Sequence, residues 1–268
     1  MKFIAEIGWN FVGDMKLAEN MILSAKKSGA DYAKFQVWNP QYLKDGPWDE
    51  DGRREIYEKA YLNEERLNFL LKSCEQNNIG FFVSIFEKKS LQMVNSHISD
   101  LIKIPSHECT NFELIDLALS SFEKVFLSIG AIEKSKLDEL IKRYSKNSQL
   151  EVMHCVSSYP LNSENVNLPK LIYLIEKFGK AGYSSHYTGI TDAVVASGLG
   201  ASIVEKHFTI DQDLPGRDNK FALLPDQFSK LISESKIAKK CMQDKGLDIQ
   251  DCEKDVANIM RGRWSKNE

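Results

Sequence analysis

The chain has 268 residues, of which 43% are hydrophobic, so it can bury a sizeable core in one or two domains. Its 35 basic and 38 acidic residues are well mixed and give a formal charge of −3, which argues against a basic nucleic-acid-binding surface and against a long acidic tail. No apolar run reaches the length of about 18 residues that a membrane span needs.

The cysteines and the first residues indicate the compartment. The five cysteines form no C-x-x-C pair and their number is odd, which favours a reducing compartment over a disulfide framework. The opening MKFIAEIGWN reaches a glutamate before any long apolar stretch forms, unlike a secretory signal peptide. We therefore expect a cytoplasmic protein with no nucleic-acid and no membrane partner.

Short apolar runs alternate with longer amphipathic segments along the chain. Eight runs have the length and the Ile, Val and Phe content of β-strands: 3–8, 32–37, 80–86, 100–105, 124–130, 150–155, 181–186 and 202–208. Helical patterns cover 13–30, 62–78, 111–121, 132–144, 167–178, 188–199 and 225–243. The second of these helices has Asn63 as its predicted N-cap.

The order of these elements predicts the fold class. Strands that alternate with helices pair in parallel through right-handed crossovers. Eight such units predict an α/β fold, a (β/α)8 TIM barrel, over residues 1–245, with 246–268 as a C-terminal tail. A doubly wound open sheet is the competing arrangement, but the chain has neither a G-x-G-x-x-G nor a G-x-x-x-x-G-K phosphate turn. A long polar and aromatic insertion, 39–62, follows the second strand, as an active-site loop would.

Polar side chains gather where the predicted strands end, and in a TIM barrel these ends carry the active site. The groups with charged, hydroxyl or imidazole side chains are Glu6, Lys34, Ser84, Lys103, Ser106, His107, Glu108, Ser128, His154, Ser157, Ser158, Tyr159, Ser184, Ser185, His186, Glu205, Lys206 and His207. Burying an unpaired charge costs several kcal/mol, so we expect these groups to pair with one another or with a ligand. For any single residue, a Lys–Glu pair that only packs the core is an equally good interpretation.

The residue types at this rim indicate two kinds of ligand. Lysine ammonium and serine hydroxyl groups are donors for a phosphate or a carboxylate. His186 and His207 lie on adjacent predicted strands and can ligate one metal ion. A lone histidine is more often structural, but two histidines beside carboxylates, with no thiolate, suit a labile catalytic metal better than a structural zinc.

Seven segments in order resemble the barrel domain of the sialic acid (N-acetylneuraminate) synthase family, which includes legionaminic and pseudaminic acid synthases. They cover about residues 1–240 and are IAEIGWNFVGD (4–14), AKKSGADYAKFQ (25–36), IKIPSHECTN (102–111), FLSIG (126–130), MHCVSSYP (153–160), GYSSHYTGI (182–190) and VEKHFTIDQDLPGRD (204–218). The most specific of these is the last, in which E-K-H-F-T is followed by P-G-x-D.

The resemblance implies that the chain condenses phosphoenolpyruvate with an amino-sugar aldehyde such as N-acetylmannosamine, giving a 3-deoxy-2-keto sugar acid and phosphate. It implies a divalent metal, typically Mn²⁺ with Mg²⁺ or Co²⁺ as alternatives, on His186 and His207. Around phosphoenolpyruvate it puts Lys34, Lys103, Ser106, Ser128, Ser157 and Ser184. It gives catalytic roles to Glu6, which handles water, and to Lys103, Glu108 and Tyr159, and it puts Glu108, Tyr159 and Asp218 on the sugar side.

The chain departs from the family pattern near these positions. Phe11 replaces a histidine, Ile85 a threonine near the phosphate, and Ser157 an asparagine. Ser185 replaces an aspartate beside a metal ligand, which predicts weaker metal binding because such a carboxylate tunes the histidine. The family's antifreeze-protein-like domain has no counterpart in 246–268, so we expect any homodimer to use the barrel surface.

Two other interpretations stay open. The second interpretation is a TIM-barrel aldolase or lyase that acts on a 2-keto acid, whose mark is a Schiff-base lysine. The third interpretation is a non-catalytic barrel subunit that needs a partner chain. Retention of both histidines and both lysines argues against this third interpretation.

Overall fold

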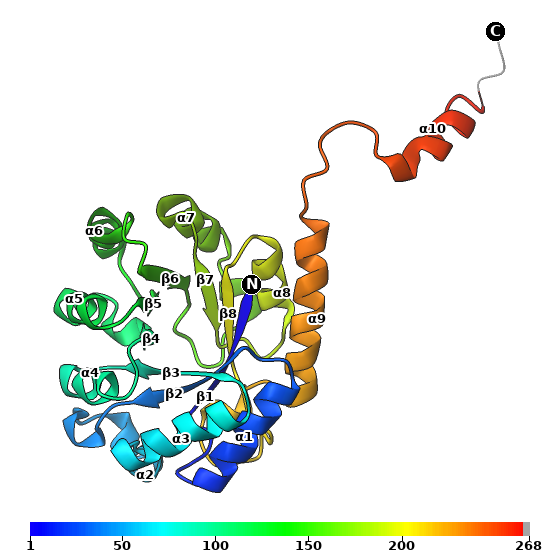
Figure 1. The fold of residues 1–268 in the computed structure, drawn as a ribbon. Coiled ribbons are helices and arrows are strands. Elements are labelled where there is room, and N and C mark those ends of the chain that lie inside the picture. Colours follow the sequence, from blue (N-terminus) through cyan, green and yellow to red (C-terminus); the bar gives the residue numbers. More distant parts are fainter. Residues whose placement is uncertain (265–268) are drawn as a thin grey trace.

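The computed structural model describes residues 1–264, and its eight parallel strands form a closed barrel in chain order (Figure 1). The strands are β1 (Lys2–Gly8), β2 (Tyr32–Val37), β3 (Gly80–Ile85), β4 (Leu101–Ile104), β5 (Lys124–Ser128), β6 (Leu150–His154), β7 (Gly182–Ser185) and β8 (Ile203–His207). The first strand closes the barrel against the last, with Glu6 opposite His207. The predicted TIM barrel is confirmed. Each strand begins and ends within one residue of its predicted range, except β5, which ends two residues before the predicted residue 130.

Helices surround the barrel and connect its strands (Figure 1). They are α1 (Met15–Lys27), α2 (Arg53–Ala60), α3 (Glu64–Gln76), α4 (Lys88–Asn95), α5 (Phe112–Ser121), α6 (Lys134–Tyr144), α7 (Pro169–Phe178), α8 (Thr191–Gly198), α9 (Pro225–Cys241) and α10 (Lys254–Ile259). Asn63 caps α3, because its side chain accepts a hydrogen bond from the backbone N–H of Arg66. The predicted cap is therefore confirmed.

Three of these helices, α2, α4 and α10, were not predicted, and α10 lies in the segment expected to be a C-terminal tail. Helix α4 has only eight residues, and it buries Ser90, Leu91 and Val94, too few positions to give a clear helical period. Glu87 caps it by accepting a hydrogen bond from the backbone N–H of Ser90. Helix α2 lies inside the insertion, whose many charges hide its short amphipathic pattern.

Successive side chains of each strand alternate between the barrel interior and the surrounding helices. One interior layer is apolar and consists of Ile4, Phe82, Phe126, Met153 and Ile203. The next interior layer lies two residues further along the same strands and is formed by Glu6, Ser84, Ser128, Cys155 and Glu205. The apolar layer is thus the floor beneath a polar layer, and the polar layer lies at the carboxyl ends of the strands, where TIM-barrel sites are found.

A separate ionic cluster lies on the other side of this floor, at the amino ends of the strands. The buried carboxylate of Glu151 lies 3.0 Å from Lys124 Nζ and 2.7 Å from Lys180 Nζ, and it accepts a hydrogen bond of 2.5 Å from Ser202 Oγ. Burial tends to raise the pKa of Glu151, but these three donors outweigh it and hold the pKa below its usual value. Ion pairs of Glu151 with two lysines therefore lie at the amino-terminal end of the barrel.

The insertion predicted to be an active-site loop has its own short helices. It contains the 3₁₀ turns Pro40–Tyr42 and Pro47–Asp49, followed by α2. The guanidinium of Arg54 joins these turns, because it donates to the carbonyl oxygens of Pro40 and Leu43 and pairs with the carboxylate of Asp49. The insertion is therefore a folded unit rather than an extended loop.

The segment after α9 extends away from the barrel and ends in α10 (Figure 1). The sequence expectation of a C-terminal tail begins at residue 246, and its last four residues, 265–268, lie outside the part of the chain that the structure describes. None of the helices within residues 1–264 combines the length and the apolar character that crossing a membrane requires.

Candidate active site

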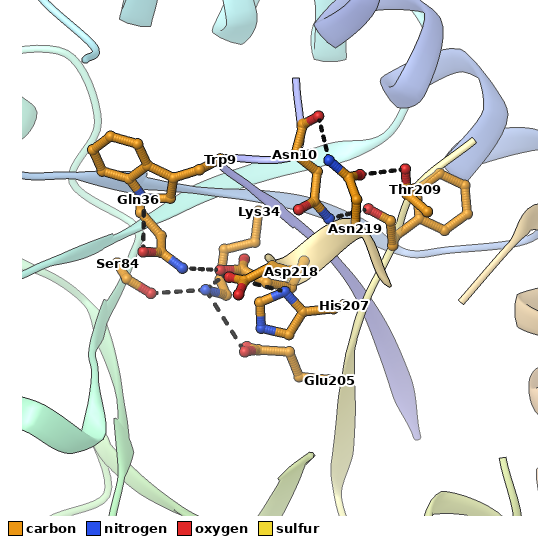
Figure 2. A network of polar contacts seen from close by, with 12 residues as sticks. Trp9, Asn10, Lys34, Gln36, Ser84, Glu205, His207, Thr209, Asp218 and Asn219 are labelled. Atoms are coloured by element: carbon orange, nitrogen blue, oxygen red, sulfur yellow. Dashed lines mark hydrogen bonds and ion pairs between the residues drawn. The ribbon is translucent and has the colours of Figure 1, made fainter. Parts of the chain in front are cut away.

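Two lysines and two glutamates converge in the polar layer of the barrel, and Figure 2 shows Lys34 and Glu205 among them. Lys34 Nζ on β2 lies 2.7 Å from Glu6 Oε2 on β1 and 3.6 Å from Glu205 Oε1 on β8. Lys103 Nζ on β4 donates a hydrogen bond of 2.6 Å to the same Glu205 oxygen. The four side chains come from four strands and are each at most 6% exposed, so two positive and two negative charges balance in a buried space.

Burial and mutual contact shift the pKa values of these groups. Burial raises the pKa of Glu6, and the nearby Glu205 adds to this rise against the opposing effect of Lys34. Burial lowers the pKa of Lys103 despite its contact with Glu205. Burial disfavours the charged Glu205 as well, but Lys103 and Lys34 outweigh it and lower its pKa. Glu205 is therefore the fixed anion of the cluster, and Glu6 is the carboxylate poised to take up a proton.

Serine hydroxyls border the lysines. Lys34 Nζ donates to Ser84 Oγ at 2.7 Å, and Ser184 Oγ donates to Glu205 Oε1 at 3.2 Å. The hydroxyl of Ser128 is buried and has no hydrogen-bond partner among the described residues. Ser84 and Ser128 therefore each keep an O–H group free to donate next to two ammonium groups, which is the composition of an anion site.

Gly130, just beyond β5, brings two further serines together. Its backbone N–H donates to Ser106 Oγ at 2.9 Å. A Cβ at this position would lie 2.3 Å from Ser157 Oγ and 2.8 Å from Ser106 Oγ, closer than carbon and oxygen approach. Only glycine therefore allows both hydroxyl groups to pack against this turn.

The two predicted metal ligands lie side by side at the ends of β7 and β8. The ring centroids of His186 and His207 are 5.4 Å apart. His186 Nδ1 lies 3.1 Å from the carbonyl oxygen of Val156, so it carries the proton and leaves Nε2 with a free lone pair. Burial lowers the pKa of His186 to about 4, and burial together with His186 and the lysines lowers the pKa of His207.

Both imidazoles are therefore neutral near pH 7, which is the form that binds a metal ion. Within residues 1–264 no group of three or more His, Cys, Asp and Glu side chains is arranged to hold a metal. Two neutral histidines beside polar space fit a divalent ion whose remaining ligands come from substrate and water. They do not fit a structural zinc, which needs four protein ligands.

A buried lysine on β8 holds the loop that follows β7. Lys206 points out of the barrel, since its strand neighbours Glu205 and His207 point in. Its Nζ donates to the carbonyl oxygen of Tyr187 at 2.6 Å and lies 3.2 Å from Asp192 Oδ2. Asp192 also accepts a hydrogen bond of 2.9 Å from Tyr183 OH. This network joins β7, β8 and α8 and fixes the residue that follows His186.

Two of the predicted sugar-side residues, Tyr159 and Asp218, lie beside the histidines. The ring of Tyr159 is 4.0 Å from that of His186, and Arg217 donates to the Tyr159 carbonyl at 2.9 Å. Asp218 Oδ2 lies 3.8 Å from His207 Nδ1 (Figure 2). Burial raises the pKa of Asp218 to about 6, and Glu6 adds to the rise. An aromatic ring, that of Tyr159, and an acidic side chain, that of Asp218, therefore lie next to the two histidines.

The charged cluster, the two histidines, Tyr159 and Asp218 border one cavity of about 490 Å³ at the carboxyl ends of the strands. Eleven of the twelve predicted site residues line it: Glu6, Lys34, Lys103, Ser106, Glu108, Ser128, Tyr159, Ser184, His186, His207 and Asp218. The twelfth, Ser157, lies behind Gly130 with its hydroxyl buried and unpartnered. The insertion also borders the cavity, through Asn39, Tyr42, Leu43, Trp48, Arg53, Ile56 and Tyr57.

Sequence reasoning missed the aromatic wall of this cavity. Trp9 after β1, Trp38 after β2, Tyr57 on α2 and Phe86 after β3 all line the cavity, and Trp38 packs against the other three rings at centroid distances of 4.7–5.9 Å. The available signal was a large aromatic residue directly after two predicted strands, Trp9 and Trp38, and another at the end of a third, Phe86. Two residues at which the chain departs from the family pattern lie outside this aromatic wall. Phe11 packs edge-on against Phe35 in the core. Ser185 Oγ accepts a hydrogen bond from the backbone N–H of Tyr187.

Comparison with known proteins agrees with this geometry. The profile of the NeuB family matches residues 21–246. The N,N'-diacetyllegionaminic acid synthase of Campylobacter jejuni is 31% identical over 96% of this chain and 82% of its own length, and the pseudaminic acid synthase of that organism is 30% identical over 92% and 76%. A crystal structure of N-acetylneuraminic acid (sialic acid) synthetase from Leptospira borgpetersenii, in complex with citrate, superposes with a TM-score of 0.86 at 30% identity, covering 97% of this chain and 92% of that one.

These relatives are named sugar-acid synthases, so the expectations of a sialic acid synthase-like enzyme and of a role in carbohydrate biosynthesis are confirmed. The structural agreement extends over nearly the whole chain, and the profile match includes β2 to β8 with their predicted site residues. The chain belongs to the NeuB family.

Proposed function

We propose that the protein condenses phosphoenolpyruvate with an N-acylated amino-sugar aldehyde and releases a 3-deoxy-2-keto sugar acid and inorganic phosphate. The observation that carries this proposal is the cavity in which Lys34 and Lys103 meet beside His186 and His207. One end of this cavity has the donors for an anionic phosphate ester, and the other has the groups for a polar, ring-sized acceptor. The names of the relatives support a sugar acid as product.

The lysines and serines hold phosphoenolpyruvate. In the ligand-free site, Lys34 and Lys103 are already paired with Glu6 and Glu205, so an arriving phosphate shares these cations with the carboxylates. Ser84, Ser128 and Ser184 lie within the same layer and supply neutral hydrogen-bond donors. A preorganised set of donors in a buried space binds a phosphate strongly and orients its enol carbon toward the cavity mouth.

The reaction forms one carbon–carbon bond. Carbon C3 of phosphoenolpyruvate attacks the aldehyde carbon, the aldehyde oxygen takes a proton, and positive charge develops at C2. Water adds to C2, and phosphate leaves as the 2-keto group forms. Glu6 is the carboxylate that takes the proton of this water, because its raised pKa makes it a better base than an exposed glutamate.

A divalent metal ion, typically Mn²⁺, is part of this proposal. His186 and His207 would hold it, and when bound it polarises the aldehyde carbonyl as a Lewis acid. Lys206 holds the backbone that follows His186, and so keeps the two imidazoles in reach of one ion. Glu108, Tyr159 and Asp218 are on the acceptor side of the cavity and bind the hydroxyl and amide groups of the sugar.

The proposed reaction belongs in the cytoplasm. The buried cysteines Cys74, Cys109 and Cys155 are free thiols, as are the exposed Cys241 and Cys252, which suits a reducing compartment.

A substrate panel tests the proposal. The purified chain is incubated with phosphoenolpyruvate, Mn²⁺ and a set of hexosamine aldehydes, and phosphate release is followed. Release that depends on the aldehyde supports the synthase. No release, together with borohydride trapping of pyruvate on a lysine, supports an aldolase instead, and Lys103 is the candidate because burial lowers its pKa. Metal or ligand binding without any turnover supports a non-catalytic subunit.

A further inference from the structure

Trp9 follows β1 directly and reaches back over the polar layer of the barrel. The residue is 7% exposed, and its indole Nε1 donates a hydrogen bond of 2.8 Å to Gln36 Oε1 at the end of β2 (Figure 2). Gln36 Nε2 in turn donates a hydrogen bond of 2.7 Å to Glu6 Oε1. A chain of two hydrogen bonds therefore runs from an indole, through one amide, to the carboxylate that handles water in the proposed reaction.

The chemistry of the three groups makes this chain directional. An indole N–H can only donate, and an ionised carboxylate can only accept. The amide of Gln36 satisfies both neighbours in one orientation alone, with its oxygen toward Trp9 and its nitrogen toward Glu6. In the flipped orientation, the NH₂ group would face the indole N–H and the carbonyl oxygen would face the carboxylate. Trp9 therefore selects the orientation of Gln36 that presents a donor to Glu6.

The surroundings leave Glu6 little freedom. Its Oε2 faces Lys34 Nζ at 2.7 Å, so each carboxylate oxygen has one partner on β2. Gly8 adopts a φ of +53°, and a Cβ there would lie 3.2 Å from Glu6 Oε1 and 3.3 Å from Gln36 Nε2. The backbone of Gly8 thus approaches this carboxylate closely. Rotation of the Gln36 amide would remove the hydrogen bond that Glu6 Oε1 accepts.

The indole is itself held by the aromatic wall of the cavity. Its ring centroid is 4.7 Å from that of Trp38 and 4.9 Å from that of Tyr57 on α2. We propose that Trp9 is a positioning residue, which acts through Gln36 to keep the Glu6 carboxylate in the orientation that the water-addition step needs. This inference rests on the proposed function, in which Glu6 takes a proton from water.

The chain offers a matched control for this role. Trp38 belongs to the same aromatic group, but its indole Nε1 is buried and has no hydrogen-bond partner among the described residues. Trp9→Phe and Trp38→Phe each replace an indole by a phenyl ring in one cluster. The two variants therefore differ in whether a hydrogen bond to Gln36 is lost.

Kinetics give the first readout. Trp9→Phe is expected to lower kcat about tenfold or more below that of Trp38→Phe, since a hydrogen bond that orients a charged catalytic group is lost. The KM for phosphoenolpyruvate, the Kd for Mn²⁺ and the Tm are expected to stay within about twofold or a few degrees of wild type. Equal kcat values in the two variants overturn the proposal.

A second readout does not depend on turnover. The chain has four tryptophans, so the indole N–H resonances of a ¹⁵N-labelled sample can be assigned by their loss in the two Phe variants. Gln36→Leu is expected to shift the Trp9 resonance upfield and to leave that of Trp38 in place. An unmoved Trp9 resonance overturns the hydrogen-bond chain itself. If the wild-type protein catalyses no condensation, the proposed function is wrong. The NMR experiment still tests the hydrogen bond between Trp9 and Gln36, because it does not require turnover.

Discussion

Lys103 Nζ lies 2.6 Å from Glu205 Oε1, and both side chains are buried beneath the cavity. A buried ion pair of this kind contributes little net stability, because desolvation offsets the attraction of the two charges. Removing only one partner is different, since the other charge is then buried without compensation. The pair therefore links the proposed anion-binding role of Lys103 to the stability of the barrel.

Lys103→Met is expected to lower the free energy of unfolding by about 3–5 kcal/mol and to abolish turnover. The double variant Lys103→Met/Glu205→Gln restores charge balance, with Lys34 and Glu6 left as a pair 2.7 Å apart. We expect it to recover most of the lost stability but none of the activity. Urea denaturation of the two variants and a phosphate-release assay check this, and a double variant as unstable as the single one would contradict it.

His207→Ala is expected to weaken Mn²⁺ binding by more than about 100-fold, since one of the two proposed protein ligands is lost. The matched control is His97→Ala, which removes a histidine that lies outside the cavity and leaves both proposed ligands intact. Titration with Mn²⁺ followed by electron paramagnetic resonance measures free metal in both variants. Wild-type affinity in His207→Ala would sink the metal assignment.

Gly130→Ala tests the serine pocket. The added methyl group would come within 2.3 Å of Ser157 Oγ and 2.8 Å of Ser106 Oγ, so both side chains must move. We expect the KM for phosphoenolpyruvate to rise about tenfold or more, with a smaller change in the KM for the acceptor. Gly179→Ala is a control for glycine loss, because no atom lies within 4 Å of the methyl position there. Gly179 has a φ of +78°, so an alanine there strains the backbone. The Gly179→Ala variant therefore shows how backbone strain away from the cavity affects the KM for phosphoenolpyruvate.

The cluster at the other end of the barrel predicts a pH dependence of stability. The donors around Glu151 hold its folded-state pKa below the value of about 4.3 in an unfolded chain. Its contribution is therefore fully present above that unfolded pKa and is lost as the pH falls through the lower folded pKa. Glu151→Gln is expected to cost about 1–3 kcal/mol at pH 7, and the difference from wild type should shrink steadily below about pH 4.

Thermal or urea unfolding at a series of pH values measures this difference. Glu139→Gln is the control, since Glu139 pairs with Lys136 and Arg143 on the exposed face of α6 and should change stability little at any pH. A Glu151→Gln penalty that stays constant down to pH 3 would contradict the linkage to this carboxylate.

The strand pattern of the barrel was predictable because each strand is a short apolar run between turn residues. Glu205, Lys206 and His207, for example, end such a run, which indicated that β8 ends in polar side chains but not which of the three face the interior. Helix α4 was not predictable from the same signal, because its eight residues complete barely two turns. Fold class thus followed from the repeated unit, whereas short connecting helices depend on tertiary packing.

The site was predictable where the strands carry it. Lys34, Lys103 and His186 lie at strand ends, and the strand order alone brings such ends to one rim. Trp9 and Tyr57 were not predicted, because their meeting depends on how the insertion folds back over the barrel. The hydrogen bonds between these side chains were not predictable either. Gln36 links Trp9 to Glu6 through side-chain geometry, which the spacing of residues in the sequence does not contain.

The central claim is that the cavity joins two substrates by a carbon–carbon bond. The most direct test uses phosphoenolpyruvate labelled with ¹³C at C3, with N-acetylmannosamine as acceptor and Mn²⁺ present, followed by ¹³C NMR. The account predicts that the label appears as a methylene carbon bonded to the former aldehyde carbon, with one phosphate released per bond formed. Label recovered only in the methyl group of pyruvate would contradict it, because phosphate would then leave without condensation.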